Sequence, residues 1–185
     1  MKKKILWITK TAMLLALLIC LQWVGSTIPV PLAKQLITGT LVNCVLAIAV
    51  LYVGWSSGIT VALISPVCAF FLTIAPNFIT VAPIMLGNVC FVVLLRWIAG
   101  GKAVWKKPVG LIAASGVKFA VLYVLVVKII CGVAADGLAG KQVGPWKIVM
   151  PPVLMFAWPQ LVTALTGGAI ALLILPALKR IDNGQ

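Results

Sequence analysis

The amino-acid sequence predicts an all-α integral membrane protein, a bundle of six transmembrane helices with both termini in the cytoplasm. The chain of 185 residues is 63% hydrophobic and only 9% charged, more apolar than a soluble core of this length requires. Its apolar residues gather in runs of about 20, the length at which a helix crosses a hydrocarbon core of ~30 Å. Prolines, glycines and short polar stretches separate the runs. We therefore expect one membrane domain over residues 1–185.

The first three helices are expected at about residues 5–28, 35–54 and 57–75. Pro29 and Pro31 end the first, because a helix interior does not accommodate proline. The glycine- and serine-containing residues 54–58 form a tight reversal after the second helix.

The last three helices are expected at about residues 78–99, 109–133 and 148–178. The pair Gly100-Gly101 ends the fourth helix. The longest polar stretch, residues 134–147, follows the fifth helix and is expected to run along the surface.

The distribution of lysine and arginine predicts the orientation, since cytoplasmic ends of membrane helices are enriched in both. With a cytoplasmic N-terminus, the outer side holds only Lys34, Lys141 and Lys147. The cytoplasmic side then holds a much larger set: Lys2, Lys3, Lys4, Lys10, Arg96, Lys102, Lys106, Lys107, Lys179 and Arg180. The net charge of +13 is thus explained by topology and anionic lipid headgroups rather than by nucleic acid, because no separate basic domain exists.

Titratable groups for chemistry are almost absent. The acids are Asp136, in the polar stretch, and Asp182, in the tail, and the chain has no glutamate and no histidine. Enzymes, proton-coupled carriers and metal sites depend on such groups. The sequence therefore predicts a protein that is not an enzyme and has no cofactor and no metal site.

A few isolated polar residues remain inside the apolar runs. Lys118 lies about 13 Å into the fifth helix, near the bilayer midplane, where a lysine is costly unless it meets water, carbonyls or an anion. The amides and hydroxyl of interest are Gln35, Thr38, Asn43, Asn88 and Gln160. The alternative for each amide is an interhelical hydrogen bond that stabilises by about 0.6–2 kcal/mol, and for Gln35 a simple interfacial position.

Two tryptophans, Trp23 and Trp158, lie deeper than the interfacial belt and are candidates to line a pocket. Ala12 and Ala16, four residues apart in the first helix, form a small-residue face on which another helix can pack closely. The alternative is packing within the bundle.

The ordered motifs of the chain resemble those of the substrate-binding S component of energy-coupling factor (ECF) transporters. The residues that carry the resemblance span nearly the whole chain: Ala12-x-x-x-Ala16, then Thr38-Gly39-Thr40-Leu41-Val42-Asn43, Gly58-Ile59-Thr60 through Ser65-Pro66, Pro83-Ile84-Met85-Leu86-Gly87-Asn88, and Gly116-Val117-Lys118-Phe119 with Tyr123.

The resemblance implies a high-affinity binding subunit for a vitamin or related micronutrient, with a pocket in its outer half and a covering loop at about residues 29–34. It implies docking through Ala12 and Ala16 onto a transmembrane T subunit, with two cytoplasmic ATPases, in a bacterial cytoplasmic membrane. The candidate substrate-binding residues are Trp23, Gln35, Thr38, Asn43, Asn88, Lys118, Tyr123, Trp158 and Gln160.

Lysine and amides without acids favour a neutral or anionic substrate. Two other functions remain open: a ligand-free structural or assembly protein of the membrane, and a small carrier or channel that works without partners.

Overall fold

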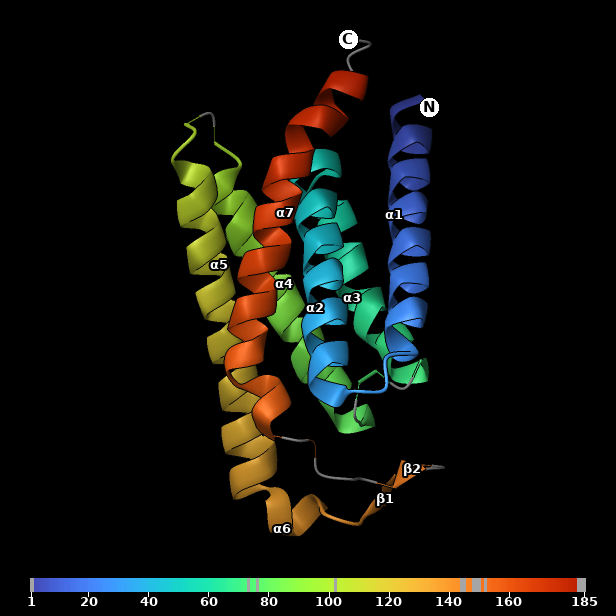
Figure 1. Ribbon diagram of the computed structural model, residues 1–185, viewed down its shortest axis with the longest axis vertical. Coiled ribbons are helices and arrows are strands. Elements are labelled where there is room, and N and C mark those ends of the chain that lie inside the picture. The colour runs from blue at the N-terminus through green and yellow to red at the C-terminus, as the bar shows by residue number, and fades with distance from the viewer. Residues whose placement is uncertain are drawn as a thin grey trace.

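The computed structural model of the chain is a bundle of long helices that run side by side (Figure 1). It describes residues 2–72, 74–75, 77–101, 103–143, 146–147, 151 and 153–182. The N- and C-terminal ends lie at the same end of the bundle, which we call the terminal end (Figure 1). The all-α class predicted from the sequence is confirmed.

The first half of the chain forms three helices. Helix α1 spans Lys2–Ser26 and α2 spans Pro31–Ile48, continuing as a π-helical turn over Ala49–Val53. Helix α3 spans Trp55–Phe71. Pro31 is the first residue of α2, a position where its missing N–H leaves no hydrogen bond unmade. Gly54, at φ 132°, makes the reversal into α3 in a conformation that favours glycine.

The middle of the chain forms a helix pair. A 3-10 turn, Phe78–Thr80, leads into α4, which spans Val81–Ala99. Helix α5 spans Lys106–Leu122 and continues as a π-helix over Tyr123–Val133.

Short elements and one long helix complete the chain. Helix α6, Ala135–Leu138, is followed by strands β1, Gln142–Val143, and β2, Trp146–Lys147, which pair antiparallel with Gln142 opposite Lys147. A 3-10 turn, Val153–Phe156, precedes α7, Trp158–Asp182. The polar stretch expected at the surface therefore forms α6 and the two strands, which lie at the end opposite the termini (Figure 1).

Five helices within the described residues are long and apolar enough to cross a membrane. They are Lys4–Ser26, Pro31–Val53, Phe78–Ala99, Lys106–Val133 and Trp158–Asp182. Helix α3 is also apolar, but at 17 residues it is shorter. By length and composition, the protein is a multi-pass membrane protein.

The start of the last helix differs from the prediction. We expected a helix from residue 148, but α7 begins at Trp158. Residues 148–150 and 152 lie outside the described part of the chain, and Pro151 lies in no helix or strand. The apolar run is continuous, but Pro159 is preferred in the first turn of a helix and disfavoured in its interior. The helix therefore starts beside this proline.

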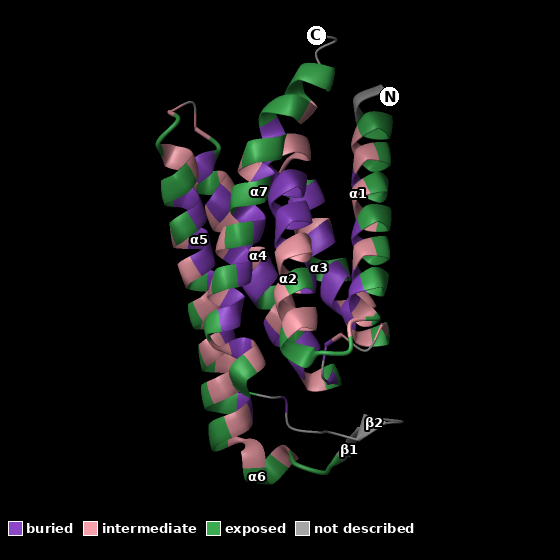
Figure 2. Cartoon of the chain, viewed as in Figure 1, coloured by how far each residue is buried: buried purple, intermediate pink, exposed green. Residues whose placement is uncertain are grey.

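Helix α2 forms the centre of the bundle. It packs on α7, α1 and α3, and α4 packs on both α3 and α5. The stretch of α2 from Asn43 to Ile48 and the following residues to Leu51 are buried, which Figure 2 shows as the densest purple. Helix α1 contacts the rest through a narrow stripe that includes the fully buried Leu18, and most of its surface is exposed (Figure 2).

Two glycines of α7 allow its close contact with neighbouring helices. A Cβ on Gly167 would overlap the carbonyl oxygen of Thr40 in α2, and a Cβ on Gly168 would overlap the side chain of Leu111 in α5. At the terminal end, Lys10 of α1 and Asp182 of α7 form an ion pair, with Lys10 Nζ 2.7 Å from Asp182 Oδ1.

Candidate functional site

A cavity opens in the half of the bundle that lies away from the termini. Gln22 near the end of α1, Gln35 near the start of α2, Ser65 near the end of α3 and Gln160 near the start of α7 all line it. Its volume is about 70 Å³, within about 570 Å³ of unoccupied space that includes its open mouth. A volume of this size holds several water molecules.

The cavity wall combines a few polar groups with apolar side chains. The residues that line it are Gln22, Gln35, Thr38, Gly39, Val42, Asn43, Ser65, Pro66, Ala69, Ile74, Ala75, Ile84, Asn88, Lys118, Phe156 and Gln160. An apolar wall with a few convergent polar groups is typical of small-molecule sites.

Lys118 is the only charged residue in this wall. Its side chain is 3% exposed, and its Nζ donates hydrogen bonds to Asn43 Oδ1 at 2.6 Å and Asn88 Oδ1 at 2.7 Å. The three residues come from α5, α2 and α4, so the cluster joins three helices. We call Lys118, Asn43 and Asn88 the lysine cluster.

The second shell of contacts fixes how the lysine cluster is oriented. Asn43 Nδ2 donates to Gly39 O at 2.8 Å and to Thr163 Oγ1 at 3.4 Å. With its amide nitrogen held in this way, Asn43 must present its oxygen to Lys118. The ring of Phe91, fully buried, lies 5.5 Å from Lys118 Nζ. The lysine is thus held in one place, facing the bundle interior.

A second polar group lies on the α1 and α3 side of the cavity. Gln22 is 1% exposed, and its Nε2 donates to Ser65 O at 3.1 Å and to Ser65 Oγ at 3.3 Å. The other atom of this amide, Gln22 Oε1, is buried and has no partner among the described residues, and neither has Thr38 Oγ1. Buried polar atoms normally have a partner, and leaving one unpaired costs about 1–3 kcal/mol.

Most of the candidate residues from the sequence lie in the cavity wall. They are Gln35, Thr38, Asn43, Asn88, Lys118 and Gln160. Gln160 Nε2 is held by Met155 O at 3.0 Å, in the turn that precedes α7. The wall therefore brings together polar residues from α2, α4, α5 and α7.

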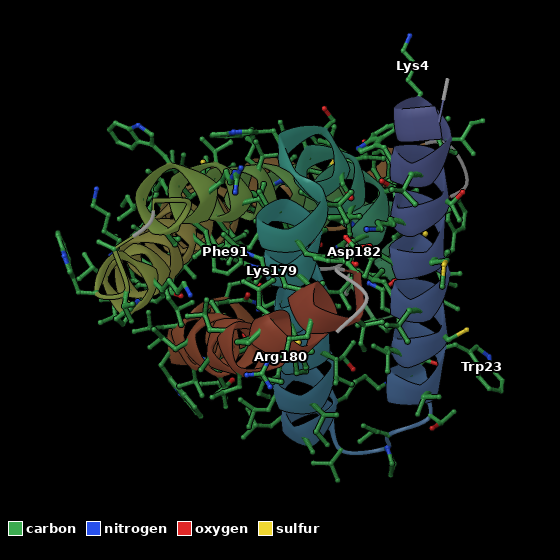
Figure 3. All side chains as sticks on the ribbon, turned by 90° about the horizontal axis from the view of Figure 1, so that it is seen from above. Lys4, Trp23, Phe91, Lys179, Arg180 and Asp182 are labelled. Atoms are coloured by element: carbon green, nitrogen blue, oxygen red, sulfur yellow. The ribbon has the colours of Figure 1, made fainter. Side chains whose placement is uncertain are left out.

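The three aromatic candidates lie outside the cavity wall. Trp23 is 62% exposed and points away from the bundle (Figure 3), and Trp158 is 48% exposed. Tyr123 stacks on Phe119, with ring centroids 5.8 Å apart. Successive helical residues point about 100° apart, so Trp23 turns outward because its neighbour Gln22 turns inward.

Sequence reasoning missed two polar residues of the wall. Gln22 is an isolated amide inside the apolar run of α1, the same signal that selected Asn43 and Asn88. The neighbouring Trp23 drew the attention instead. Ser65 appeared only as part of a motif in the third helix.

The expected covering loop differs from the structure. Residues 31–34 of the expected loop are the first turn of α2, and none of residues 29–34 lines the cavity. Ala12 and Ala16 are both exposed on α1, on the side of this helix that no other described helix covers.

No group of three or more potential metal ligands occurs among the described residues. Comparison with protein-family models, with curated proteins and with solved structures found no match. The arrangement of the cavity is therefore the main guide to function.

Proposed function

We propose that this chain is the substrate-binding S component of an ECF-type importer, which takes up a vitamin-like small molecule with energy from separate ATPases. The observation that carries the proposal is the position of the cavity. It lies in the half of the bundle away from the termini, and the terminal end carries the lysine- and arginine-rich segments. With that end in the cytoplasm, the cavity faces the outside, where an importer captures its substrate.

The proposed topology has six crossings, with α3 as the sixth. Its 17 residues reach about 25 Å, slightly less than the hydrocarbon core. A short apolar helix is accommodated when the bilayer thins locally or neighbouring helices cover its ends. An even number of crossings agrees with termini that lie at one end of the bundle.

The energetics support a dependence on partners. The two acids of the sequence, Asp136 and Asp182, lie in α6 and at the end of α7, so no carboxylate lines the cavity to bind a coupling proton. The exposed Ala12 and Ala16 provide a surface where a T subunit can approach α1 closely. In this proposal the ATPases drive transport through that contact, in a bacterial cytoplasmic membrane.

The test is copurification after gentle extraction from the native membrane. We expect a membrane T subunit and two ATPases to copurify with the chain, and Ala12→Trp or Ala16→Trp to abolish the complex. Ala82→Trp, on an exposed position of α4 at the other end of the bundle, is the matched control and should keep it.

Two results would contradict the proposal. Transport of a substrate into liposomes that contain this chain alone would show a self-sufficient carrier. A chain that copurifies with no ATPase under conditions that keep it folded would indicate a structural protein.

A further inference from the structure

We propose that the cavity binds a small organic monoanion, with its carboxylate at Lys118 and a hydrogen-bond donor of the same molecule at Gln22 Oε1. This inference rests on the proposed function, since it specifies the chemical class of the substrate. It follows from three features of the wall: a cation without a counterion, an acceptor without a donor, and an apolar surface between them.

The first feature is the unbalanced charge of Lys118. An ammonium group has three N–H donors, and two of them are used by Asn43 Oδ1 and Asn88 Oδ1. Both acceptors are neutral amides, and the only acids of the chain are Asp136 and Asp182, which do not line the cavity. A buried charge without a counterion is costly, and an anion that enters the cavity removes this cost.

Asn88 adds a donor beside Lys118. Its Oδ1 accepts from Lys118, whereas its Nδ2 donates to no acceptor among the described residues. A carboxylate has two oxygens, which can accept from Lys118 Nζ and from Asn88 Nδ2 together.

The number of charges selects a monoanion. Lys118 is the only cation in the wall, so a single negative charge balances it. A phosphate ester carries about −1.5 to −2 charges at neutral pH and would leave an excess buried. An amine would meet Lys118 with the same sign of charge. The wall therefore favours a carboxylate over both.

The second feature is the acceptor at Gln22. Its Nε2 is occupied by Ser65, which turns Oε1 into an acceptor, and Oε1 is buried without a partner. An O–H or N–H group of the substrate would supply the missing donor. Thr38 Oγ1, also buried and unpartnered, can pair with the same group.

The third feature is the apolar surface of the wall. Val42, Pro66, Ile84 and Phe156 contribute to it, so the part of the molecule between carboxylate and donor is a carbon skeleton. The cavity recognises an acid with a hydroxyl or N–H group rather than an inorganic anion.

The test is titration calorimetry on the purified full chain in detergent with a series of probes. The probes are the linear hydroxy acids from glycolate to 6-hydroxyhexanoate, the carboxamide and amino-alcohol counterparts of each, and the unsubstituted carboxylates. Varying the length finds the separation of the two polar groups. We expect at least one hydroxy acid to bind, and its carboxamide and amine counterparts to bind at least about tenfold more weakly.

Variants assign the contacts. We expect Lys118→Met to weaken binding of the preferred hydroxy acid by about 10- to 100-fold. Lys128→Met, at an exposed position of the same helical segment, is the control and should leave binding unchanged. Gln22→Leu should remove the advantage of the hydroxy acid over the unsubstituted carboxylate.

Asn88→Asp keeps the test decisive if Lys118→Met does not fold. Its carboxylate is close in shape to the amide and would pair with Lys118, so the variant should fold and lose affinity for anions. The inference is overturned if no carboxylate binds wild-type protein, if a carboxamide or amine binds as tightly as its acid, or if Asn88→Asp keeps full affinity. Any of these results, with the complex of the previous subsection intact, would overturn the substrate class and leave the proposed function standing.

Discussion

At the scale of single residues, the lysine cluster explains how a charged side chain is held inside an apolar bundle. Asn43 and Asn88 each offer an oxygen to Lys118, and Asn43 is itself fixed by Gly39 and Thr163. Hydrogen bonds to charged groups contribute about 1.5–3 kcal/mol, more than those between neutral groups. The cluster thus ties α2, α4 and α5 together at the bottom of the cavity.

We expect Asn43→Leu to lower the free energy of unfolding in detergent by about 1–3 kcal/mol, because Lys118 and Thr163 both lose a buried partner. The measurement is thermal or denaturant unfolding followed by circular dichroism. The control is Thr40→Val, since the Thr40 hydroxyl pairs with Thr166 at an exposed position and its loss should change stability little. Equal effects of both substitutions would contradict the role given to the cluster.

Sequence reasoning at this scale succeeded where depth decides and failed where direction decides. Lys118, Asn43 and Asn88 were selected because polar groups deep in a membrane helix need partners, and the structure brings them together. Trp23 and Gln22 are neighbours at the same depth, so only the rotation of α1 separates them. That rotation depends on how α1 packs on α2 and α3, and no single segment of sequence encodes it.

At the scale of helices, close packing of α7 on α2 and α5 depends on Gly167 and Gly168. Small residues at helix contacts let backbones approach, which is a main source of stability when no hydrophobic effect acts between helices. The same α7 presents Gln160 and Thr163 to the cavity region. A shift of α7 would therefore reach the lysine cluster through Thr163.

We expect Gly167→Val to destabilise the protein by at least about 1–3 kcal/mol, because its side chain would overlap Thr40 O and Asn43. The control is Gly116→Ala in α5, where a Cβ meets nothing within 4 Å and where alanine is the better helix former. Unfolding temperature in detergent is the measurement. A stable Gly167→Val variant would mean that α7 does not approach α2 as closely as described.

Helix boundaries show what local sequence can and cannot predict. The expected helix at 78–99 coincides with the apolar span Phe78–Ala99, because turns with clear signals flank it. The expected start at residue 148 was wrong, since the run of apolar residues continues through several prolines without a polar break. The first helical residues of α2 were missed for a related reason: Pro31 was read as a breaker, whereas it opens the helix.

At the scale of the whole molecule, charge and cavity divide the bundle into two ends. The terminal end carries Lys10 and Asp182 in an ion pair and the basic ends of α4 and α7, Arg96 and Lys179 with Arg180. The opposite end carries the cavity. This division is what the proposed topology predicts for a receptor that loads from outside and meets its ATPases inside.

We expect a cysteine at position 137, in α6, to react with a membrane-impermeant thiol reagent on intact protoplasts. A cysteine at position 180, near the end of α7, should react only after permeabilisation. The variants Gly137→Cys and Arg180→Cys would be made in a background without Cys20, Cys44, Cys68, Cys90 and Cys131. The reverse pattern of labelling would contradict the orientation, and labelling of both on intact protoplasts would contradict the even number of crossings.

The central claim is that this chain is a receptor that holds one small molecule in the cavity beside Lys118. Native mass spectrometry of gently purified protein from cells grown in rich medium tests it most directly. We predict the mass of one chain plus one small organic acid for the wild type, and the mass of the bare chain for Lys118→Met, with Lys128→Met behaving as the wild type. A wild-type protein that is folded but carries no small molecule would contradict the claim.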